Sequence, residues 1–267
     1  MQQKVVGGSV SFDNAADIYD ATRALPPEIA AKQTEALLTE LRALGSDRLL
    51  EIGIGTGRIA RPLMERGVRV TGVDLAPRMV KRLRQQLTPR HIAPDLAFAD
   101  ATRLPFRESS FRAALMVHVL HLVSDWRATL AETLRVLGSG GVFFHDVTQY
   151  PEPNPRRVLW TKRKELFAKH GIVTRLRPEP EQIVEALRAA GGLQRTVVYA
   201  EDEDRDVLQK AVDDLRNRVD SSTWEIPSAV HDAFVTDFES WCAQEYGDLQ
   251  REYAVRMQYT LEVWTFA

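Results

Sequence analysis

One short stretch decides the fold of this sequence: Leu49-Leu50-Glu51-Ile52-Gly53-Ile54-Gly55-Thr56-Gly57-Arg58. Its apolar start predicts a buried strand over residues 48–52, and the pattern after the glycines predicts a helix over 57–65. Glycines at positions 53, 55 and 57 permit a tight turn between the two elements and leave room for a ligand beside the backbone. The stretch therefore predicts a strand, a glycine-rich loop and a helix in that order.

Strands and helices alternate on both sides of this loop. Such alternation implies an α/β fold in which parallel strands carry helices on both faces and ligands bind at the carboxyl ends of the strands. Apolar and β-branched runs predict further strands at 68–73, 95–99, 111–117 and 142–147. Helical spacing of apolar residues predicts helices at 28–44, 77–87 and 125–137.

The second half of the chain has a different pattern. Pro151, Pro153 and Pro155 predict a loop over residues 149–157. Beyond it we expect helices at 158–169, 180–190, 206–219 and 229–243 and strands at 193–199 and 253–263. We expect one continuous domain, divided into an N-terminal arm and helix (1–44), a ligand-binding core (45–148) and a remainder with helical cap insertions (149–267).

Two carboxylates follow predicted strands. Asp74 ends the second strand, where it can accept hydrogen bonds from a ribose diol or cap the helix that starts at Pro77. Asp100 follows the third strand, where it can accept from the exocyclic amine of adenine or act as a turn residue. Arg58 stands where the dinucleotide fingerprint G-x-G-x-x-G has its last glycine, which argues against a pyrophosphate ligand.

Four ordered motifs in this sequence resemble those of the class I S-adenosylmethionine (SAM)-dependent methyltransferases, in their small-molecule type 11 branch. They are Leu49–Gly57, the acidic Asp74, the segment Asp100-Ala101-Thr102-Arg103-Leu104-Pro105-Phe106, and Arg135-Val136-Leu137-Gly138-Ser139-Gly140-Gly141. Gly138-Ser139 departs from the charged residue and proline common there in the family, at a turn away from the ligand site.

The resemblance implies a Rossmann-like, mostly parallel seven-stranded sheet of order 3-2-1-4-5-7-6 whose last strand is antiparallel. It also implies SAM as cofactor and a small-molecule methyl acceptor. Glu51 would lie beneath the methionine part, Leu75 and Met79 would flank adenine, and Val117 would sit beside the sulfonium. The full set of cofactor residues implied is Tyr19, Arg23, Glu51, Gly53, Ile54, Gly55, Gly57, Asp74, Leu75, Met79, Asp100, Ala101, Val117 and His118.

Methyl transfer from a sulfonium is an in-line displacement that depends mainly on alignment and on exclusion of water. His118 and His121 follow the fourth strand and are the candidates for a general base, although either can instead hydrogen-bond a loop carbonyl. Trp160, Arg218 and Trp224 are candidate acceptor-binding residues, with core packing as the alternative for the tryptophans. No metal site is expected.

The amino-acid composition indicates which binding partners and which cellular compartment to expect for this protein. The formal net charge of −2 over 267 residues lacks the basic footprint of a nucleic-acid-binding protein, and the basic run 156–164 is also explained as a solvated helix face. The single Cys242 permits no internal disulfide and suits a reducing cytoplasm. We expect neither a signal peptide nor a membrane span.

Three other functions share some of these features. An NAD-dependent oxidoreductase has a similar loop and an acid at the position of Asp74. A nucleic-acid methyltransferase usually carries a [DNS]-P-P-[FYW] motif, where this chain has Val117-His118-Val119-Leu120. A SAM-binding module without catalysis fits the same motifs. The sequence also leaves open whether oxygen, nitrogen, carbon or sulfur is methylated.

Overall fold

A computed structural model describes residues 9–13, 24–172 and 178–267 of the chain. The described residues form two compact units. The sheet unit comprises residues 9–13, 24–147, 178–200 and 259–267, and the helical unit comprises residues 148–172 and 201–258. The predicted boundaries at 44/45 and 148/149 stay predictions.

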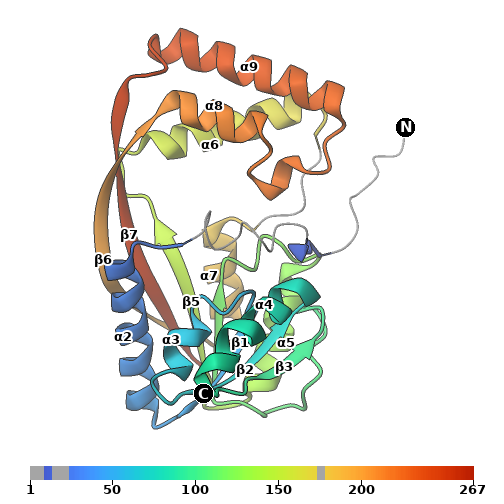
Figure 1. Ribbon diagram of the computed structural model, residues 1–267, viewed down its shortest axis with the longest axis vertical. Helices are drawn as coiled ribbons and strands as arrows, with labels where there is room; N and C mark the ends of the chain where they lie inside the picture. The colour runs from blue at the N-terminus through green and yellow to red at the C-terminus, as the bar shows by residue number, and fades with distance from the viewer. Residues whose placement is uncertain (1–8, 14–23, 173–177) are drawn as a thin grey trace. The chain divides into compact units, whose positions relative to one another are not determined.

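Seven strands form one sheet in the order β3-β2-β1-β4-β5-β7-β6, which confirms the predicted strand order (Figure 1). Strands β1 to β5 pair in parallel. Phe266 bonds to Gly141 and Glu262 meets His145, so β7 runs antiparallel to β5. The strands are β1 (Arg48–Ile52), β2 (Arg69–Asp74), β3 (Asp95–Phe98), β4 (Ala113–Val117), β5 (Val142–Gln149), β6 (Leu193–Val207) and β7 (Glu252–Thr265).

Each face of the sheet buries a separate apolar cluster. One cluster joins Leu49, Leu115 and Phe144 to helices α2 (Pro27–Leu44), α3 (Ala60–Met64) and α4 (Pro77–Leu87). The other joins Ile52, Met116 and Phe143 to α5 (Trp126–Leu137) and α7 (Pro180–Ala189). Successive strand residues point to opposite faces, so a strand buried on both faces reads as the continuous apolar run seen in the sequence.

The predicted loop over 149–157 was wrong at both ends. Strand β5 continues to Gln149, and α6 (Pro155–Lys169) already begins at Pro155. A proline is well placed in the first turn of a helix, because its missing N–H has no partner there in any case. Asn154 caps this helix by accepting the N–H of Arg156 over 3.0 Å.

Two further predicted boundaries were wrong. The helix predicted over 57–65 is shorter, since only Ala60–Met64 are helical after the turn that follows the glycine loop. Strand β6 was predicted to end at residue 199 but runs to Val207 through an acidic stretch. Its acids meet basic or amide partners across the ladder: Glu203 bonds to Arg256 over 3.0 Å and Glu201 to Gln258 over 2.9 Å. Such cross-strand pairs stabilise an exposed strand that has few apolar residues.

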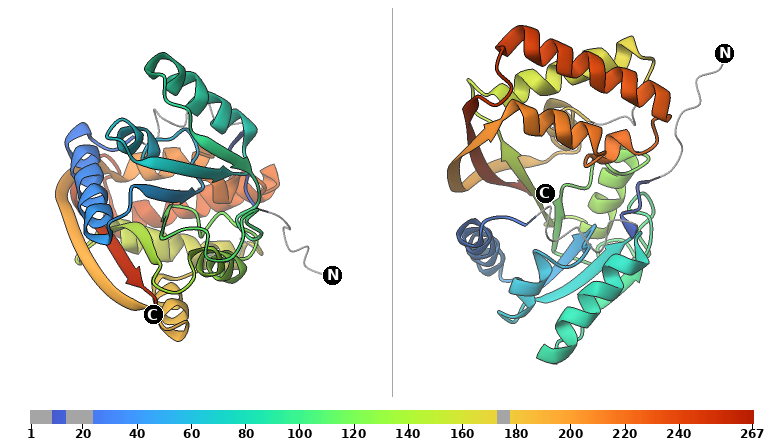
Figure 2. Two further views of the ribbon diagram at one scale, coloured as in Figure 1. Left: turned by 90° about the horizontal axis from the view of Figure 1, so that it is seen from below. Right: turned by 45° about the horizontal axis from the view of Figure 1, so that its top comes forward.

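The helical unit is built around α9 (Ser228–Tyr246), which packs against α6 and α8 (Leu208–Arg216) (Figures 1 and 2). Its apolar core includes Phe167, Phe234 and Phe238. No helix within the described ranges is both long enough and apolar enough to span a membrane.

Candidate functional site

The glycine loop leaves β1 in a conformation that requires glycine. Gly53, Gly55 and Gly57 have φ angles of 77°, 56° and 75°, in the left-handed region. A Cβ atom on Gly53 would lie 2.4 Å from Cγ2 of Val119, and one on Gly57 would lie 2.3 Å from Cδ1 of Leu83. Both glycines therefore serve close packing as well as the turn, whereas Gly55 is the more open of the three.

Hydrogen bonds tie this loop to the end of β2. The N–H groups of Gly53 and Ile54 both donate to the carbonyl of Val73, over 2.8 and 3.0 Å. Asp74 accepts the N–H of Gly55 at Oδ2 over 2.7 Å and the N–H of Ala76 at Oδ1 over 2.8 Å. Burial raises the pKa of Asp74, although these N–H groups oppose the shift. Asp74 is thus held rigidly, with carboxylate lone pairs left for a ligand.

Asp100, which lies just beyond β3, is held in a similar way. Its Oδ1 atom accepts from both the backbone and the hydroxyl of Thr102, over 2.9 and 2.8 Å. Its Oδ2 atom accepts the hydroxyl of Ser9 over 2.7 Å. Partial burial acts against ionisation, but these hydrogen bonds lower the pKa of Asp100 overall. The side chain is therefore an ionised acceptor at neutral pH.

Both acids line a pocket in the sheet unit at the carboxyl ends of the strands. It encloses about 640 Å³, a figure that includes the open solvent at its mouth. Nine of the fourteen cofactor residues expected from the sequence line it: Gly53, Gly55, Asp74, Leu75, Met79, Asp100, Ala101, Val117 and His118.

The other five expected residues lie elsewhere. Glu51 is buried below the loop, and Ile54 and Gly57 pack into the core against Gly72 and Leu83, so none of the three lines the pocket. Tyr19 and Arg23 lie outside the described residues. Glu51 is buried because side chains alternate along a strand: Ile52 points to one face of the sheet, and Glu51 points to the other, which α2 covers.

The N-terminal segment 9–13 was missed as part of the pocket. Ser9, Val10 and Phe12 line it, and Val10 donates its N–H to the carbonyl of Leu122 over 2.8 Å. Asp13 accepts the N–H of Arg78 in the first turn of α4, also over 2.8 Å. The segment has no helical or strand periodicity, so only its long-range contacts reveal its place. Sequence reasoning also missed Val73, Ala99, Val119, Leu122 and Val123 as lining residues.

The two candidate bases lie close together in the turn after β4. Their ring centroids are 6.4 Å apart at an interplanar angle of 70°. His118 is exposed, lines the pocket and has a φ of 56°, which is uncommon for a residue other than glycine. His121 does not line the pocket. Backbone strain of this kind gathers at ligand sites, where the surrounding structure maintains it.

The three candidate acceptor residues gather within the helical unit. The guanidinium of Arg163 lies 5.0 Å from the ring centroid of Trp160 and pairs with Asp220 over 3.0 Å. Asp220 belongs to the same connection as Arg218 and Trp224, whose indole N–H donates to the carbonyl of Arg218 over 2.8 Å. Buried Arg163 thus joins α6 to the segment that carries the other two candidates.

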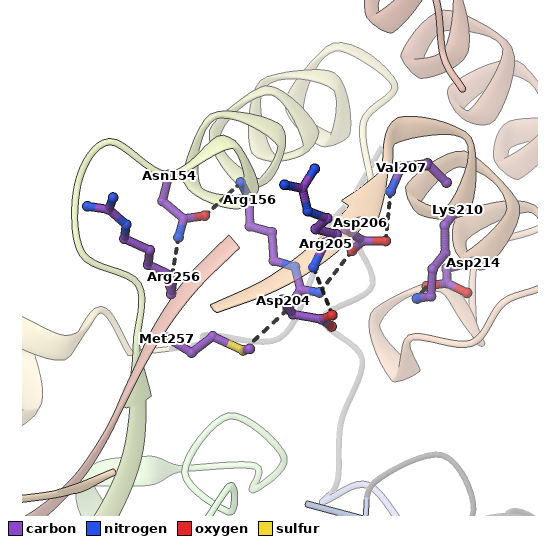
Figure 3. Close-up of polar contacts among 10 residues, drawn as sticks. All are labelled: Asn154, Arg156, Asp204, Arg205, Asp206, Val207, Lys210, Asp214, Arg256 and Met257. Carbon is purple, nitrogen blue, oxygen red and sulfur yellow. Dashed lines mark hydrogen bonds and ion pairs between the residues drawn. The ribbon is translucent and has the colours of Figure 1, made fainter. Parts of the chain in front are cut away.

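The basic run at the start of α6 is largely compensated by nearby acids. Arg156 donates to Asp206 over 2.8 Å, and Asn154 donates to the carbonyl of Arg256 over 2.9 Å; both contacts are drawn in Figure 3. The other ion pairs of the run are Arg157–Glu152, Lys162–Glu165 and Arg163–Asp220. Paired charges release few counterions from a polyanion, so this run does not favour nucleic-acid binding.

Metal binding finds no support in the described part of the chain. No three His, Cys, Asp or Glu side chains there are placed so that they could hold a metal ion. Cys242 is buried in α9, and burial raises the pKa of its thiol to about 11. The thiol is therefore protonated at neutral pH.

Comparisons with known proteins agree with this geometry. Residues 50–145 match the family described as "Methyltransferase domain". The chain is 35% identical over 132 residues to the malonyl-[acyl-carrier protein] O-methyltransferase of Serratia marcescens, covering 49% of each chain. It is 29% identical over 154 residues to the demethylmenaquinone methyltransferase of Renibacterium salmoninarum, covering 57% of this chain and 62% of that one.

The chain spans about half the length of the curated relatives it matches. Among solved structures, the YcgJ protein of Bacillus subtilis superposes with a TM-score of 0.60 at 14% identity, covering 88% of this chain and 98% of that one. At that level of identity the likeness shows the fold alone.

Proposed function

Residues 50–145 form a class I SAM-dependent methyltransferase domain, and from this premise we propose that the protein binds SAM in the pocket and methylates a small molecule. The observation that carries the proposal is a pocket lined by Asp74 and Asp100 together with Gly53 and Gly55. Two rigid acceptors match the ribose hydroxyls and the adenine amine of the cofactor. At Gly55 an added Cβ would have only Cε of Met79 within 4 Å, at 3.9 Å, so the bare backbone there leaves room for the ligand.

Each group has a distinct part in the proposed reaction. When bound, the cofactor supplies a methyl group already activated on a sulfonium. Asp74 holds the ribose end, Asp100 holds the adenine edge, and Leu75 and Met79 flank the ring. Val117, with the apolar Val119 and Val123, keeps water away from the reacting centre. Aligning the acceptor with the methyl group accounts for most of the rate.

An acceptor that loses a proton needs a base near the pocket. His118 lies on the pocket wall and His121 lies next to it, so we assign proton acceptance to this pair. We assign acceptor binding to Trp160, Arg218 and Trp224 of the helical unit. The relatives act on malonyl-[acyl-carrier protein] and on demethylmenaquinone, which makes carboxylic acids and hydroxylated aromatics the first acceptors to try.

Calorimetry and mass spectrometry test the proposal. The full chain is titrated with SAM, S-adenosylhomocysteine and NAD, and then incubated with SAM and the acceptor panel. We expect micromolar binding of the first two ligands, none of NAD, and an acceptor heavier by one methylene with one equivalent of S-adenosylhomocysteine. Binding of NAD alone overturns the proposal, and SAM binding without turnover on any acceptor favours a non-catalytic module.

A further inference from the structure

The outer face of α4 in the sheet unit carries only positive charge. The helix has four basic side chains and no acidic one: Arg78, Lys81, Arg82 and Arg84. Its apolar side chains are buried against the sheet, so the basic ones point away from it. Arg78, Lys81 and Arg84 are exposed, and Arg82 is half-buried. Figure 2 shows α4, in teal, on the outside of the sheet unit.

The stability of α4 does not account for these charges. Like charges three positions apart on a helix repel each other, and Lys81 has this spacing to both Arg78 and Arg84. Arg78 also lies in the first turn, where the helix dipole disfavours a cation. No acid offsets these effects within the helix or its flanks, because residues 75–94 contain neither Asp nor Glu.

Two of these cations have no acidic partner in the described part of the chain. Neither the ammonium of Lys81 nor the guanidinium of Arg84 forms an ion pair or a hydrogen bond with a residue there. Exposed cations near α2 behave differently, because they pair with its acids in Lys32–Glu28, Arg66–Glu35 and Arg195–Glu40. The positive charge of α4 is therefore available to an anionic partner.

Two exposed apolar side chains lie at the pocket end of the same region. Phe98 ends β3 and is 54% exposed, and Leu75, in the turn before α4, is 38% exposed. Both flank Asp74, since Phe98 is its partner in the ladder between β2 and β3 and Leu75 follows it in the chain. Phe98 shares its face of the sheet with Leu96, which packs into the cluster that α4 covers. Because Leu75 lines the pocket, this apolar pair borders it.

We propose that α4, Phe98 and Leu75 form a surface that binds an anionic lipid bilayer. The cations of Lys81 and Arg84 meet the negative headgroups, and the two apolar side chains enter the boundary between headgroups and acyl chains. A folded protein partner needs about 800 Å² of matching surface on each side, whereas a fluid bilayer accepts a few cations beside one aromatic ring. Such a contact requires no helix that crosses the bilayer. The inference goes beyond the proposed function and does not depend on it.

Co-sedimentation of the full chain with lipid vesicles tests the inference. One set of vesicles contains phosphatidylcholine alone, and the other contains equal amounts of phosphatidylcholine and phosphatidylglycerol. We expect binding to the mixed vesicles only, and weaker binding as added salt screens the charges. The double variant Lys81→Glu/Arg84→Glu should lower the partition coefficient about 25-fold or more, because each cation contributes about fivefold. Phe98→Ser should lower it about 10-fold or more by removing the buried ring.

Matched variants control for net charge and for exposed apolar area. The double variant Arg107→Glu/Arg112→Glu makes the same change of charge at two exposed positions of the sheet unit outside α4. Leu193→Ser removes an apolar side chain of β6 that is 73% exposed. Both controls should bind the mixed vesicles nearly as well as the wild type. Every variant should keep the wild-type Kd for S-adenosylhomocysteine, which also reports that it is folded, because none of the changed residues lines the pocket.

Each contrary result points to a different conclusion. The inference is overturned if the wild type ignores the mixed vesicles, binds neutral vesicles equally well, or loses no more affinity in the α4 variant than in the control. Binding to immobilised poly-glutamate without binding to mixed vesicles overturns it in favour of an acidic protein partner. If Phe98→Ser does not fold, the charge variants alone decide. A protein that binds the vesicles but not S-adenosylhomocysteine refutes the proposed function and leaves this inference standing.

Discussion

Gly55 and Asp74 are joined by a 2.7 Å hydrogen bond from the backbone N–H of the glycine to Oδ2 of the carboxyl. The bond connects the loop after β1 to the end of β2, so one residue both shapes the loop and faces the pocket. Because Oδ1 of Asp74 also accepts the N–H of Ala76, the carboxyl cannot rotate away when the pocket is empty. The acceptor for the ribose is thus preorganised, which lowers the entropy lost on binding.

Asp74→Ala should weaken S-adenosylhomocysteine and 5′-methylthioadenosine alike, by about 10- to 100-fold. Both ligands carry the ribose, and the substitution removes charged hydrogen bonds worth about 1.5–3 kcal/mol. Isothermal titration calorimetry measures the effect, with the exposed Asp95→Ala as the matched change. Normal affinity in Asp74→Ala would place the ribose elsewhere and remove the basis of the proposed cofactor site.

Gly53→Ala should lower stability more than Gly45→Ala does. Both positions have positive φ, 77° and 66°, so both variants carry the strain of a side chain in the left-handed region, about 1–2 kcal/mol. Only the Cβ at position 53 meets another atom, Cγ2 of Val119 at 2.4 Å, which adds about 1–3 kcal/mol of overpacking. Thermal unfolding measures the difference, and adding Val119→Ala should recover part of it. Equal losses at the two glycines would show that the close contact is unimportant.

The sequence predicts the first half of the fold well because its signals there are local. The runs around Leu50, Val73 and Leu115 are apolar since these strands are buried on both faces. The strand order came from the family resemblance, because periodicity carries no information about which strands are neighbours. The acidic end of β6 was missed for a related reason: its partners Arg256 and Gln258 lie more than 50 positions away.

The residues of the candidate site also differ in whether local sequence signals predict them. Asp74 and Asp100 are predictable, since Asp74 ends β2 and Asp100 lies two residues past β3, each within a motif of fixed spacing. The segment 9–13 reaches the pocket through isolated long-range hydrogen bonds at Ser9, Val10 and Asp13, a pattern without any sequence signal.

Glu51→Gln should stabilise the ligand-free protein above neutral pH. Burial raises the pKa of Glu51 to about 8, with Arg58 opposing and Asp74 adding to the shift. Between pH 4.5 and 8 the unfolded chain loses the proton that the folded protein keeps, so stability falls as pH rises through this window. Glutamine removes this loss, and a gain of about 1 kcal/mol would raise the Tm at pH 8 by about 2–4 °C.

Thermal unfolding at pH 5 and at pH 8 tests this sign. The Tm advantage of Glu51→Gln should be larger at pH 8, whereas the exposed Glu185→Gln should behave alike at both values. An advantage that is larger at pH 5 would mean that the carboxyl is ionised in the folded protein. Such a result would also indicate that Arg58 compensates the charge of Glu51 more strongly than burial opposes it.

His121→Ala should slow methyl transfer while leaving cofactor affinity nearly unchanged. His121 lies beside His118 but does not line the pocket, so its loss removes a proton acceptor without disturbing cofactor contacts. A general base contributes about 10²- to 10⁴-fold to a rate, so the rate constant measured in single-turnover experiments should decrease by a factor in that range.

His118→Asn should lower cofactor affinity as well, because position 118 faces the pocket with a φ of 56° that asparagine tolerates. His91→Asn, at an exposed position with a φ of 55°, is the matched control. Full activity in both His118→Asn and His121→Ala would show that the acceptor reacts without a base from this turn.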